Sequence, residues 1–391
     1  MPGAGDRAGR VVIAVVGASA AGLTAAQALR REGYDGPLTV IGDEDRMPYD
    51  RPPLSKQILS GAWEPERAAL PAAVAADWLL GVRATGLDVA GHRLALSTGD
   101  SLGYDKLVIA TGVTPRRLPF GRCLAGVHVL RTMAEALAFK ADLSASRSVV
   151  IVGAGFLGCE VAAVARGLGA DVTVVDPLPA PMVRQFGPWV GDSIAKLHAD
   201  HGVRLRLGLG VTGLTGAGRV EGVELADGTV VPADVVLVAI GAVPNTQWLA
   251  GSGLSLTDGV DTDSLCRAAP DVVAAGDVAS WSHPVSGKRI RVEHRMNATE
   301  QGMAAARTLL GKGEPYALVP YFWTDQYDVR IQAYGTFPAG AAHTVAAGEV
   351  GAGRFAALFA HGGRITGVLG WNLPRDTRLL RARIGEPAQR R

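Results

Sequence analysis

Apolar residues along this chain form short runs separated by stretches of helical periodicity, a pattern typical of a parallel sheet with helices on its faces. Residues 11–16 form a continuous run rich in β-branched side chains, as expected of a strand buried on both faces. A helical pattern follows to Arg31, and a second apolar run occupies 38–41. The same order recurs with runs at 149–152 and 171–175 on either side of a helical stretch. The pattern predicts two βαβ units.

The turn between strand and helix in the first unit carries small residues at fixed spacing. It reads G-x-S-x-x-G, with Gly17, Ser19 and Gly22, and the second strand ends at Asp43 and Glu44. Such glycines let the backbone approach a pyrophosphate, the helix N-terminus offers N–H donors to it, and a carboxylate accepts from the ribose hydroxyls. A lone motif could be a structural turn, but here strand, turn, helix, strand and acid occur in order. Ser19 replaces the usual middle glycine and is small enough to preserve this approach.

The second unit repeats the motif in its intact form. Gly153, Gly155 and Gly158 form a G-x-G-x-x-G, and the following strand ends at Asp176. Gly241 is assigned to the same nucleotide site. A simple dehydrogenase needs one such unit, whereas a flavoprotein that binds FAD in one domain and NADH in another needs two. The two units therefore predict FAD and NADH as cofactors.

Two further apolar strands end in tight turns, the position at which open α/β sheets bind ligands. They are Lys106–Ala110, followed by Thr111 and Gly112, and Val272–Ala275, followed by Gly276 and Asp277. The alternative is that these turns are ordinary strand ends without a ligand. For the first strand taken alone, the ligand-binding interpretation and this alternative are equally supported. The carboxylate of Asp277 would suit the ribityl chain of a flavin, so these turns are assigned to the FAD site.

From Pro315 the pattern changes to that of an antiparallel sheet. Residues 329–334 alternate, and the runs 354–361 and 364–371 flank Gly362-Gly363, a two-residue hairpin signal. A helix is predicted around 375–384. Five aromatic residues crowd the start of this region, and they are interpreted either as its core or, for Phe322 or Trp323, as a cover for the flavin. They are Tyr316, Tyr321, Phe322, Trp323 and Tyr327.

Composition narrows the function classes. A net charge of +2 over 391 residues argues against nucleic acid as the main partner. The three cysteines are widely separated, and the absence of a CxxC argues against a disulfide framework, a metal site or a redox dithiol. The first ten residues lack the apolar run of a signal peptide, and no apolar run approaches the length of a membrane span. A cytoplasmic protein without a metal is predicted.

Nearly the whole chain resembles a known family, the FAD-dependent, NADH-linked ferredoxin reductases of oxygenase and P450 systems, such as putidaredoxin reductase and biphenyl dioxygenase reductase. The stretches that carry the resemblance are the paired glycine motifs, P-Y-D-R-P-P-L-S-K at 48–56, the G-D turn, V-E-H-R-M-N-A-T-E-Q-G at 292–302 and P-Y-F-W-T-D-Q-Y at 320–327. The larger fold is similar to that of glutathione reductase and apoptosis-inducing factor.

The resemblance implies roles for particular side chains. Its expected FAD contacts are Ala21, Asp43, Arg51, Lys56, Ala84, Arg131, Gly276 and Asp277. Lys56 would stabilise the negative charge that builds on the flavin as it is reduced. Glu160 is similar to the family glutamate that faces the nicotinamide and can pair with that lysine. The alternatives are that Lys56 is only an exposed loop lysine and that Glu160 is only a carboxylate that interacts favourably with the dipole of its helix.

One position departs from the family pattern. Arg295 stands where family members often have tryptophan, close to the nicotinamide or the acceptor face, and it is kept among the expected cofactor contacts together with Trp323. Because an arginine replaces this ring, we expect the change to affect how the protein binds the nicotinamide and which acceptor it uses. The first segment of the chain holds no cysteine, which disfavours the disulfide-reductase and peroxidase branches.

The sequence thus predicts an α/β protein with two Rossmann-like domains and a C-terminal α+β domain. The expected boundaries are 1–114 and 245–314 for FAD, 115–244 for NADH and 315–391 for the C-terminal domain. Its predicted activity passes a hydride from NADH to FAD and then single electrons to a [2Fe–2S] ferredoxin. The alternatives are a flavoprotein acting on a small molecule or oxygen, and a flavin-binding signalling protein of the apoptosis-inducing-factor branch. The oligomeric state is left open.

A docked ferredoxin is expected to require a local basic face, since ferredoxins are commonly acidic. Two groups of arginines are candidates, and a helix-terminal or stem-packing role is the alternative for the second. They are Arg289, Arg291 and Arg295, and Arg375, Arg378, Arg381 and Arg383.

Overall fold

The computed structural model describes residues 11–121 and 123–388, and the chain folds into two compact units. Unit 1 comprises Met1–Asp50, Ala69–Thr114 and Val243–Leu318, and unit 2 comprises Arg51–Ala68, Pro115–Ala242 and Val319–Arg391. Two of the passages of the chain between the units fall within β8 (Val113–Pro115) and β17 (Ala242–Pro244). The first ten residues, interpreted above as lacking an apolar leader, lie outside the described residues.

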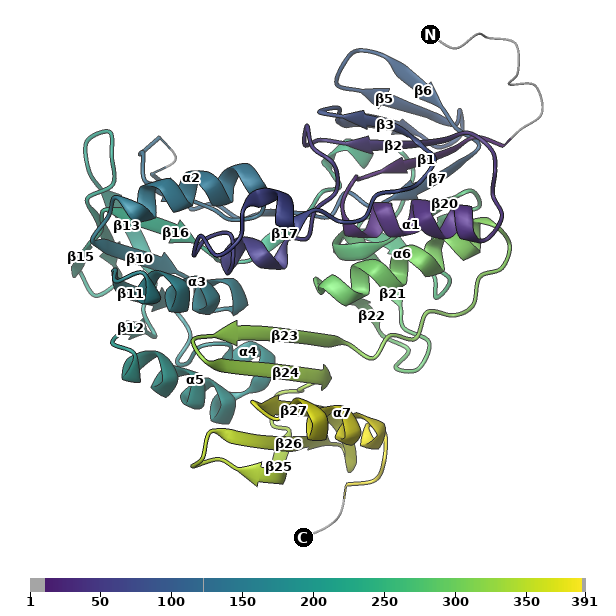
Figure 1. Cartoon of the computed structure of the whole chain (residues 1–391). Coiled ribbons are helices and arrows are strands. Elements are labelled where there is room, and N and C mark those ends of the chain that lie inside the picture. Colours follow the sequence, from purple (N-terminus) through teal and green to yellow (C-terminus); the bar gives the residue numbers. More distant parts are fainter. Residues whose placement is uncertain (1–10, 122, 389–391) are drawn as a thin grey trace. The chain divides into compact units, whose positions relative to one another are not determined.

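Unit 1 is built on a six-stranded sheet with strand order β19-β20-β7-β1-β2-β3 (Figure 1). All neighbours are parallel except β19, which runs antiparallel to β20. The strands are β1 (Ile13–Val16), β2 (Leu38–Gly42), β3 (Asp77–Leu80), β7 (Lys106–Ile109), β19 (Arg267–Ala269) and β20 (Val272–Ala274). The predicted βαβ unit at the start of the chain is therefore present.

Alternate residues of β1 face two different layers, which explains why the whole strand is apolar. Ile13 and Val15 pack in one core with α1 (Ala20–Arg31) and α6 (Arg295–Leu309), which lie side by side (Figure 1). Ala14 and Val16 pack in a second core against a three-stranded sheet. That sheet consists of β4 (Ala84–Asp88), β5 (Arg93–Leu96) and β6 (Ser101–Gly103). Burial on both faces removes the polar alternation of a half-exposed strand.

Unit 1 also contains a three-stranded sheet. Tyr316, which was expected in the C-terminal domain, packs beside this sheet. The strands are β18 (Val260–Thr262), β21 (Ala279–Ser282) and β22 (Arg289–Arg291). Trp281 of β21 is fully buried and packs on Tyr316, with ring centroids 5.4 Å apart. Tyr316 therefore belongs to the core of unit 1, and its expected place in a C-terminal core was wrong.

Unit 2 contains a second parallel sheet, with strand order β12-β11-β10-β16-β9. Its strands are β9 (Val127–His128), β10 (Ser148–Val152), β11 (Asp171–Asp176), β12 (Arg204–Leu207) and β16 (Val235–Val238). The helices of this region are α2 (Met133–Ser144), α3 (Phe156–Gly167), α4 (Val183–Phe186) and α5 (Pro188–Asp200). A small sheet of β13 (Val211–Thr215), β14 (Gly222–Leu225) and β15 (Val230–Pro232) packs through apolar side chains on β10 and β16.

Unit 2 also contains the C-terminal antiparallel sheet, with strand order β23-β24-β27-β26-β25 and α7 (Pro374–Leu380) beside it (Figure 1). The strands are β23 (Tyr321–Gln326), β24 (Val329–Gly335), β25 (Ala342–Glu349), β26 (Arg354–His361) and β27 (Arg364–Trp371). The predicted Gly362-Gly363 hairpin is confirmed, and both glycines have positive φ, as a two-residue hairpin turn requires. Pro387 bridges to Arg364.

The fold class predicted from the sequence is confirmed. The chain contains two mainly parallel sheets, each with a βαβ unit at its centre, and a C-terminal antiparallel sheet. Within the described part of the chain, no helix combines the length and the apolar composition that crossing a membrane would require.

Candidate dinucleotide-binding sites

The residues predicted to bind FAD in unit 1 follow the carboxyl ends of four neighbouring parallel strands. Gly17 follows β1, Asp43 follows β2, Thr111 follows β7 and Gly276 follows β20. Because parallel strands end at the same edge of a sheet, these turns share one edge of unit 1. This edge is the place where an open α/β sheet binds a ligand.

The first glycine motif is required by close backbone contacts. Gly17 has φ +120°, and a Cβ placed on it would lie 2.1 Å from the carbonyl oxygen of Ala110. A Cβ on Gly22 would lie 1.8 Å from the carbonyl oxygen of Gly17, so the helix and the turn approach as only glycines allow. Ser19 is the N-cap of α1, and among the described residues its side chain makes no capping hydrogen bond. The first N–H groups of α1 thus remain available to an anion.

The two acids that end β2 have different surroundings. Asp43 accepts a hydrogen bond from Arg83 at 3.1 Å, and both side chains are about two-thirds exposed. Glu44 accepts a hydrogen bond from the Tyr49 hydroxyl at 2.5 Å. An exposed carboxylate at the strand end suits ribose hydroxyls, so Asp43 stays the predicted adenosine contact, while Glu44 has a structural partner.

The later turns of unit 1 are tied together by side chains. The Thr111 hydroxyl donates to the carbonyl of Asn245 at 2.9 Å, and the Asn245 amide donates back to the carbonyl of Thr111 at 2.9 Å. Gly112 accepts from the Asn245 N–H. Gly276 has φ +78° and donates its N–H to Gln301 at 2.9 Å. These contacts fix both turns.

Three more of the residues predicted to bind FAD lie in unit 1, at Ala21, Asp277 and Ala84. A Cβ on Gly276 would lie 2.9 Å from the Cβ of Ala21, so the turn after β20 lies against α1. Asp277 is half-buried, and its carbonyl accepts from Arg291 at 3.0 Å. Ala84 is buried at the start of β4.

Arg295, which departs from the family pattern, opens α6 and forms an ion pair with Asp50. It also donates to the hydroxyl of Thr299. The preceding residue, His294, is half-buried, and partial burial of its imidazole lowers the pKa to about 4. The guanidinium is therefore engaged by an acid within unit 1, and its contact with a cofactor stays a prediction.

The second glycine motif in unit 2 repeats the geometry of the first. Gly153 has φ +110°, and a Cβ on it would lie 2.3 Å from the carbonyl oxygen of Ala239. A Cβ on Gly158 would lie 1.9 Å from the carbonyl oxygen of Gly153. Gly155 is the N-cap of α3, and a Cβ there would meet no atom within 4 Å. The turn is closed on the helix side and open where a pyrophosphate would approach.

Asp176 ends the strand next to this motif and is nine-tenths buried. Its carboxylate accepts the N–H of Ala154 at 2.7 Å and the N–H of Leu178 at 2.8 Å. Gly241 follows β16, also at the carboxyl edge of this sheet, with φ +89°. Both predicted nucleotide contacts therefore share the edge occupied by the glycine motif.

The predicted catalytic pair is formed inside unit 2. The ammonium of Lys56 lies 2.8 Å from Oε2 of Glu160, with side-chain exposures of 11% and 9%. Ser55 donates to the same oxygen at 2.6 Å, and Thr324 donates to Oε1 at 3.0 Å. Lys56 follows the short 3₁₀ helix Pro52–Ser55, and Glu160 lies two residues beyond Gly158. Because the Lys56 side chain is only 11% exposed, Lys56 is not an exposed loop lysine.

Three other predicted flavin contacts also lie in unit 2. Arg51 donates to the carbonyl of Arg131, and the N–H of Arg131 donates to Glu135 at 2.9 Å. Trp323 is half-buried in β23 and stacks on Tyr321, with centroids 5.9 Å apart. Their contact with FAD stays a prediction.

Neighbouring aromatic residues of β23 have different surroundings. Phe322 packs between Phe156 and Phe186, with ring centroids 4.5 and 5.1 Å away. Successive residues of a strand point to opposite faces, so Trp323 does not share this core. The core interpretation holds for Phe322, and Trp323 is the remaining candidate for a cover over the flavin.

Sequence reasoning missed the polar residues behind the Lys56–Glu160 pair. Thr324 and Gln326 are fully buried on the same face of β23 as Phe322, and His198 of α5 is buried beside Gln326. Polar residues at alternate positions of an otherwise apolar strand face were the available signal, because buried polar groups need partners.

The three cysteines are free, and two of them are buried. Burial raises the pKa of the Cys159 thiol and raises that of Cys266 to about 12, so both thiols stay protonated and unreactive at neutral pH. This agrees with the prediction that the chain carries no redox dithiol.

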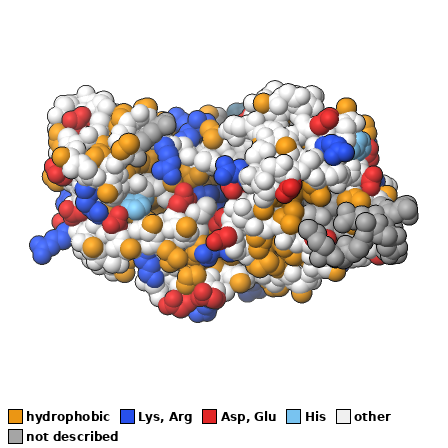
Figure 2. All heavy atoms as spheres, turned by 90° about the horizontal axis from the view of Figure 1, so that it is seen from above, with side chains coloured by type: hydrophobic (Ala, Val, Ile, Leu, Met, Phe, Trp, Pro, Cys, Tyr) orange, Lys and Arg blue, Asp and Glu red, His pale blue; other side chains and the backbone are white. Residues whose placement is uncertain are grey.

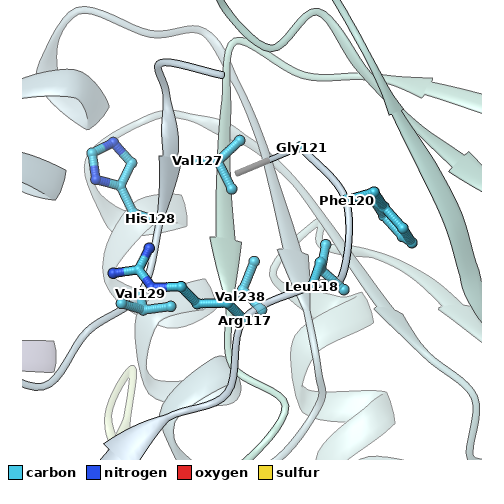
Figure 3. A pocket seen from close by; sticks show the side chains of 8 residues that line it. All are labelled: Arg117, Leu118, Phe120, Gly121, Val127, His128, Val129 and Val238. Carbon is cyan, nitrogen blue, oxygen red and sulfur yellow. The ribbon is translucent and has the colours of Figure 1, made fainter. Parts of the chain in front are cut away.

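A pocket beside β9 and β16 encloses about 280 Å³ of space that is partly open to solvent (Figure 3). Arg117, Phe120 and His128 are among the side chains around it. On the face shown in Figure 2, Lys and Arg side chains are interspersed with Asp and Glu. Such mixing agrees with the near-neutral net charge of the chain.

Together these features define a class of protein. Each unit offers a glycine turn, an open helix N-terminus and an acid at the neighbouring strand end, which are the groups that a dinucleotide requires. The residues present therefore fit two dinucleotides, and the chain has the architecture of an oxidoreductase with two dinucleotide-binding folds.

Comparison with known proteins identifies the family. Residues 11–302 match the model of the pyridine nucleotide-disulphide oxidoreductases, and residues 321–390 match that of the reductase C-terminal domain. This chain belongs to the pyridine nucleotide-disulphide oxidoreductase family.

Relatives with printed functions cover almost the whole chain. Rhodocoxin reductase of Rhodococcus erythropolis is 38% identical over 93% of this chain and 87% of its own. The ferredoxin–NAD(+) reductase subunit of the benzene 1,2-dioxygenase system of Pseudomonas putida is 36% identical over 95% and 93%. Among solved structures, the ferredoxin reductase for the CYP199A2 system of Rhodopseudomonas palustris superposes with a TM-score of 0.90 at 33% identity, covering 95% of this chain and 93% of that one. Putidaredoxin reductase, solved in covalent complex with putidaredoxin, gives 0.91 at 30%, covering 96% and 94%.

Proposed function

We propose that this protein is an FAD-dependent NADH:ferredoxin oxidoreductase that supplies electrons to a P450 or a Rieske oxygenase. The observation that carries the proposal is the presence of two complete dinucleotide-binding edges in one chain, the second beside the buried Lys56–Glu160 pair. The names of the relatives support a ferredoxin as the acceptor. The overall reaction is NADH + 2 oxidised ferredoxin → NAD⁺ + H⁺ + 2 reduced ferredoxin.

The edge of unit 1 is assigned to FAD and that of unit 2 to NADH. On this assignment, the FAD domain comprises 1–114 and 245–314, the NADH domain comprises 115–244, and 315–391 form the C-terminal domain. Gly17, Asp43 and Asp277 would hold the FAD, together with the other flavin contacts predicted above. Gly155 and Asp176 would hold the NADH. Bound FAD supplies a group that accepts a hydride and releases electrons one at a time.

Lys56 and Glu160 are assigned the roles closest to the chemistry. The Lys56 ammonium lies in a largely buried ion pair, where a fixed charge stabilises developing negative charge more strongly than it does in water. Glu160 holds that ammonium in place and would accept a hydrogen bond from the carboxamide of bound NADH. Three hydrogen bonds, donated by Ser55, Lys56 and Thr324, converge on the Glu160 carboxylate and fix the pair, so little reorganisation is needed when NADH arrives.

The kind of electron acceptor follows from how many electrons the protein itself could hold on its cysteines. Its free cysteines are unsuited to accept two electrons as a disulfide, since two are buried and protonated. A separate one-electron carrier is therefore the proposed exit, and a [2Fe–2S] ferredoxin fits it. Free thiols and a requirement for NADH also support a cytoplasmic location.

The first test is the cofactor content of the purified protein. We expect about one FAD per chain, and Asp277→Ala should lower the occupancy, because this acid lies at the Gly276 turn. Asp88→Ala, an exposed acid at the end of β4, is the matched control and should leave occupancy unchanged. Bound FMN, or no flavin after reconstitution, would refute the assignment of unit 1.

The second test is steady-state NADH oxidation with a panel of ferredoxins and rubredoxins. We expect turnover to depend on an added ferredoxin. Comparable turnover without any carrier protein would favour a flavoprotein acting on oxygen or a small molecule. Slow hydride transfer with a long-lived charge-transfer absorbance would instead favour a signalling flavoprotein.

A further inference from the structure

A continuous series of hydrogen bonds runs from Tyr327, which follows β23, through His198 of α5 to the Glu160 carboxylate, entirely inside unit 2. Behind Thr324, the amide nitrogen of Gln326 lies 3.3 Å from the Thr324 hydroxyl. Nε2 of His198 lies 2.9 Å from the amide oxygen of Gln326, and the Tyr327 hydroxyl lies 3.1 Å from Nδ1 of His198. The three central side chains are fully or almost fully buried.

The direction of each hydrogen bond in this series follows from the residue at its inner end, Glu160. A carboxylate only accepts, so the single hydroxyl proton of Thr324 points to Glu160. Thr324 must then accept from the Gln326 amide nitrogen, which leaves the amide oxygen to accept from Nε2–H of His198. In a neutral imidazole, Nδ1 of His198 is then unprotonated and accepts from the Tyr327 hydroxyl. Burial, which lowers the pKa of His198 to about 4, agrees with this neutral form.

A core of the same size could be filled with apolar side chains at less cost, because buried polar groups must each find a partner. Phe322, on the same face of β23, shows that this face accepts apolar residues. The polar residues occur only where the strand approaches Glu160 and His198. Every donor points toward the carboxylate, so these hydrogen bonds hold the Glu160 side chain in a single orientation.

We propose that Thr324 is a positioning residue, held by Gln326 and His198, that fixes the Glu160 carboxylate against Lys56 for NADH-dependent flavin reduction. The inference rests on the proposed function for its kinetic consequence. Thr324 acts through Glu160, whose second oxygen carries the bonds from Ser55 and Lys56.

The kinetic test compares two substitutions at one position. Thr324→Val keeps the shape and removes the hydroxyl, and Thr324→Ser keeps the hydroxyl. We expect Thr324→Val to slow flavin reduction at saturating NADH about tenfold, with a smaller change in the NADH concentration at half-maximal rate, because a bond to a charged group is lost. Thr324→Ser should restore the rate to within about twofold of the parent.

A matched control separates this role from general loss of packing. Thr377 of α7 is also fully buried in unit 2, but its hydroxyl bonds the carbonyl of Leu373, away from Glu160. Thr377→Val should lower the thermal midpoint without slowing flavin reduction. Equal slowing by Thr324→Val and Thr377→Val would overturn the proposal, as would a Thr324→Val protein that is reduced as fast as the parent.

A measurement without NADH tests the hydrogen bond itself. Thermal midpoints of Thr324→Val, Glu160→Gln and the double variant form a cycle, and we expect the double variant to lose less than the sum of the single losses. Additive losses would contradict the contact. A parent protein that NADH does not reduce would refute the proposed function, and this cycle would still decide whether Thr324 holds Glu160.

Discussion

The carboxylate of Asp176 accepts the backbone N–H of Ala154 at 2.7 Å, which ties the acid at the end of β11 to the glycine motif of unit 2. A second bond, from the N–H of Leu178, engages the other oxygen. A carboxylate offers about four acceptor positions, so two remain for ribose hydroxyls. The contact therefore holds Asp176 at the nucleotide-binding edge and leaves part of its carboxylate able to accept hydrogen bonds from a ribose.

NADH should be preferred to NADPH, because a 2′-phosphate at Asp176 would meet a like charge. We expect at least a roughly tenfold ratio in kcat/KM, about 1.4 kcal/mol. Asp176→Ser should reduce the ratio. Asp171→Ser, an exposed acid at the start of the same strand, is the control and should preserve it. Arg184, exposed on α4, is the cation that could soften the preference. Equal efficiency with both cofactors would remove Asp176 from this role.

Lys56→Ala should slow flavin reduction by NADH at least roughly tenfold while FAD stays bound, because the fixed charge acts on the transfer. It should also destabilise unit 2, since breaking a buried pair costs about 3–5 kcal/mol. Stopped-flow absorbance gives the rate, and Lys196→Ala, an exposed lysine of α5, is the control.

The double variant Lys56→Met/Glu160→Gln separates the two effects of Lys56. It should recover thermal stability relative to Lys56→Ala, because no buried charge is left unpaired, yet it should remain slow. Reduction at the parent rate in either variant would exclude Lys56 from the mechanism.

Stability should fall in mild acid because His198 is neutral in the folded protein, with its pKa lowered to about 4 by burial. Between about pH 6.5 and 4 the unfolded chain binds a proton that the folded chain does not, so stability rises with pH across this window. The contribution is fully present above about pH 6.5 and is lost as the pH falls toward 4. His294 acts in the same window within unit 1.

His198→Gln should flatten the dependence of the thermal midpoint on pH between 6.5 and 4.5, since the amide does not titrate. His361→Gln, an exposed position on β26, should leave the dependence as it is. An unchanged slope in His198→Gln would show that His198 is not the residue responsible.

Ferredoxin docking should depend on the C-terminal arginines more than on the group around β22. Arg291 pairs with Asp258 and Glu293, Arg289 lies 3.6 Å from Asp261, and Arg295 pairs with Asp50. Neighbouring acids thus offset this group. Arg375, Arg378 and Arg381 are exposed on and after α7.

Arg375→Glu/Arg378→Glu should raise the KM for ferredoxin without altering flavin reduction by NADH, and Arg289→Glu is the comparison. Ferredoxin reduction should fall as salt rises, since the Debye length shrinks from about 10 Å at 0.1 M to about 3 Å at 1 M. Reduction of a neutral dye should change little. Insensitivity to salt and to both reversals would contradict electrostatic docking.

The sequence by itself determined the features that depend on the local backbone. The apolar runs predicted β1, β2, β10 and β11, because a strand buried on both faces must be apolar throughout. The glycine motifs predicted the turns, because positive φ and contacts near 2 Å exclude a Cβ. Gly362-Gly363 predicted the hairpin for the same reason. Each requirement is met by residues close together in the chain.

Only the tertiary structure decided which distant side chains meet. Lys56 and Glu160 are separated by 104 residues, and the segment 51–68 folds with unit 2, which no local pattern indicates. Thr324 reaches Glu160 because β23 packs beside α3, and the same packing buries Gln326 against His198. Tyr316, adjacent in sequence to the aromatic residues of β23, packs in unit 1 instead. Such contacts follow from how whole elements pack, because a polar side chain is satisfied by whichever partner the fold brings within 3 Å.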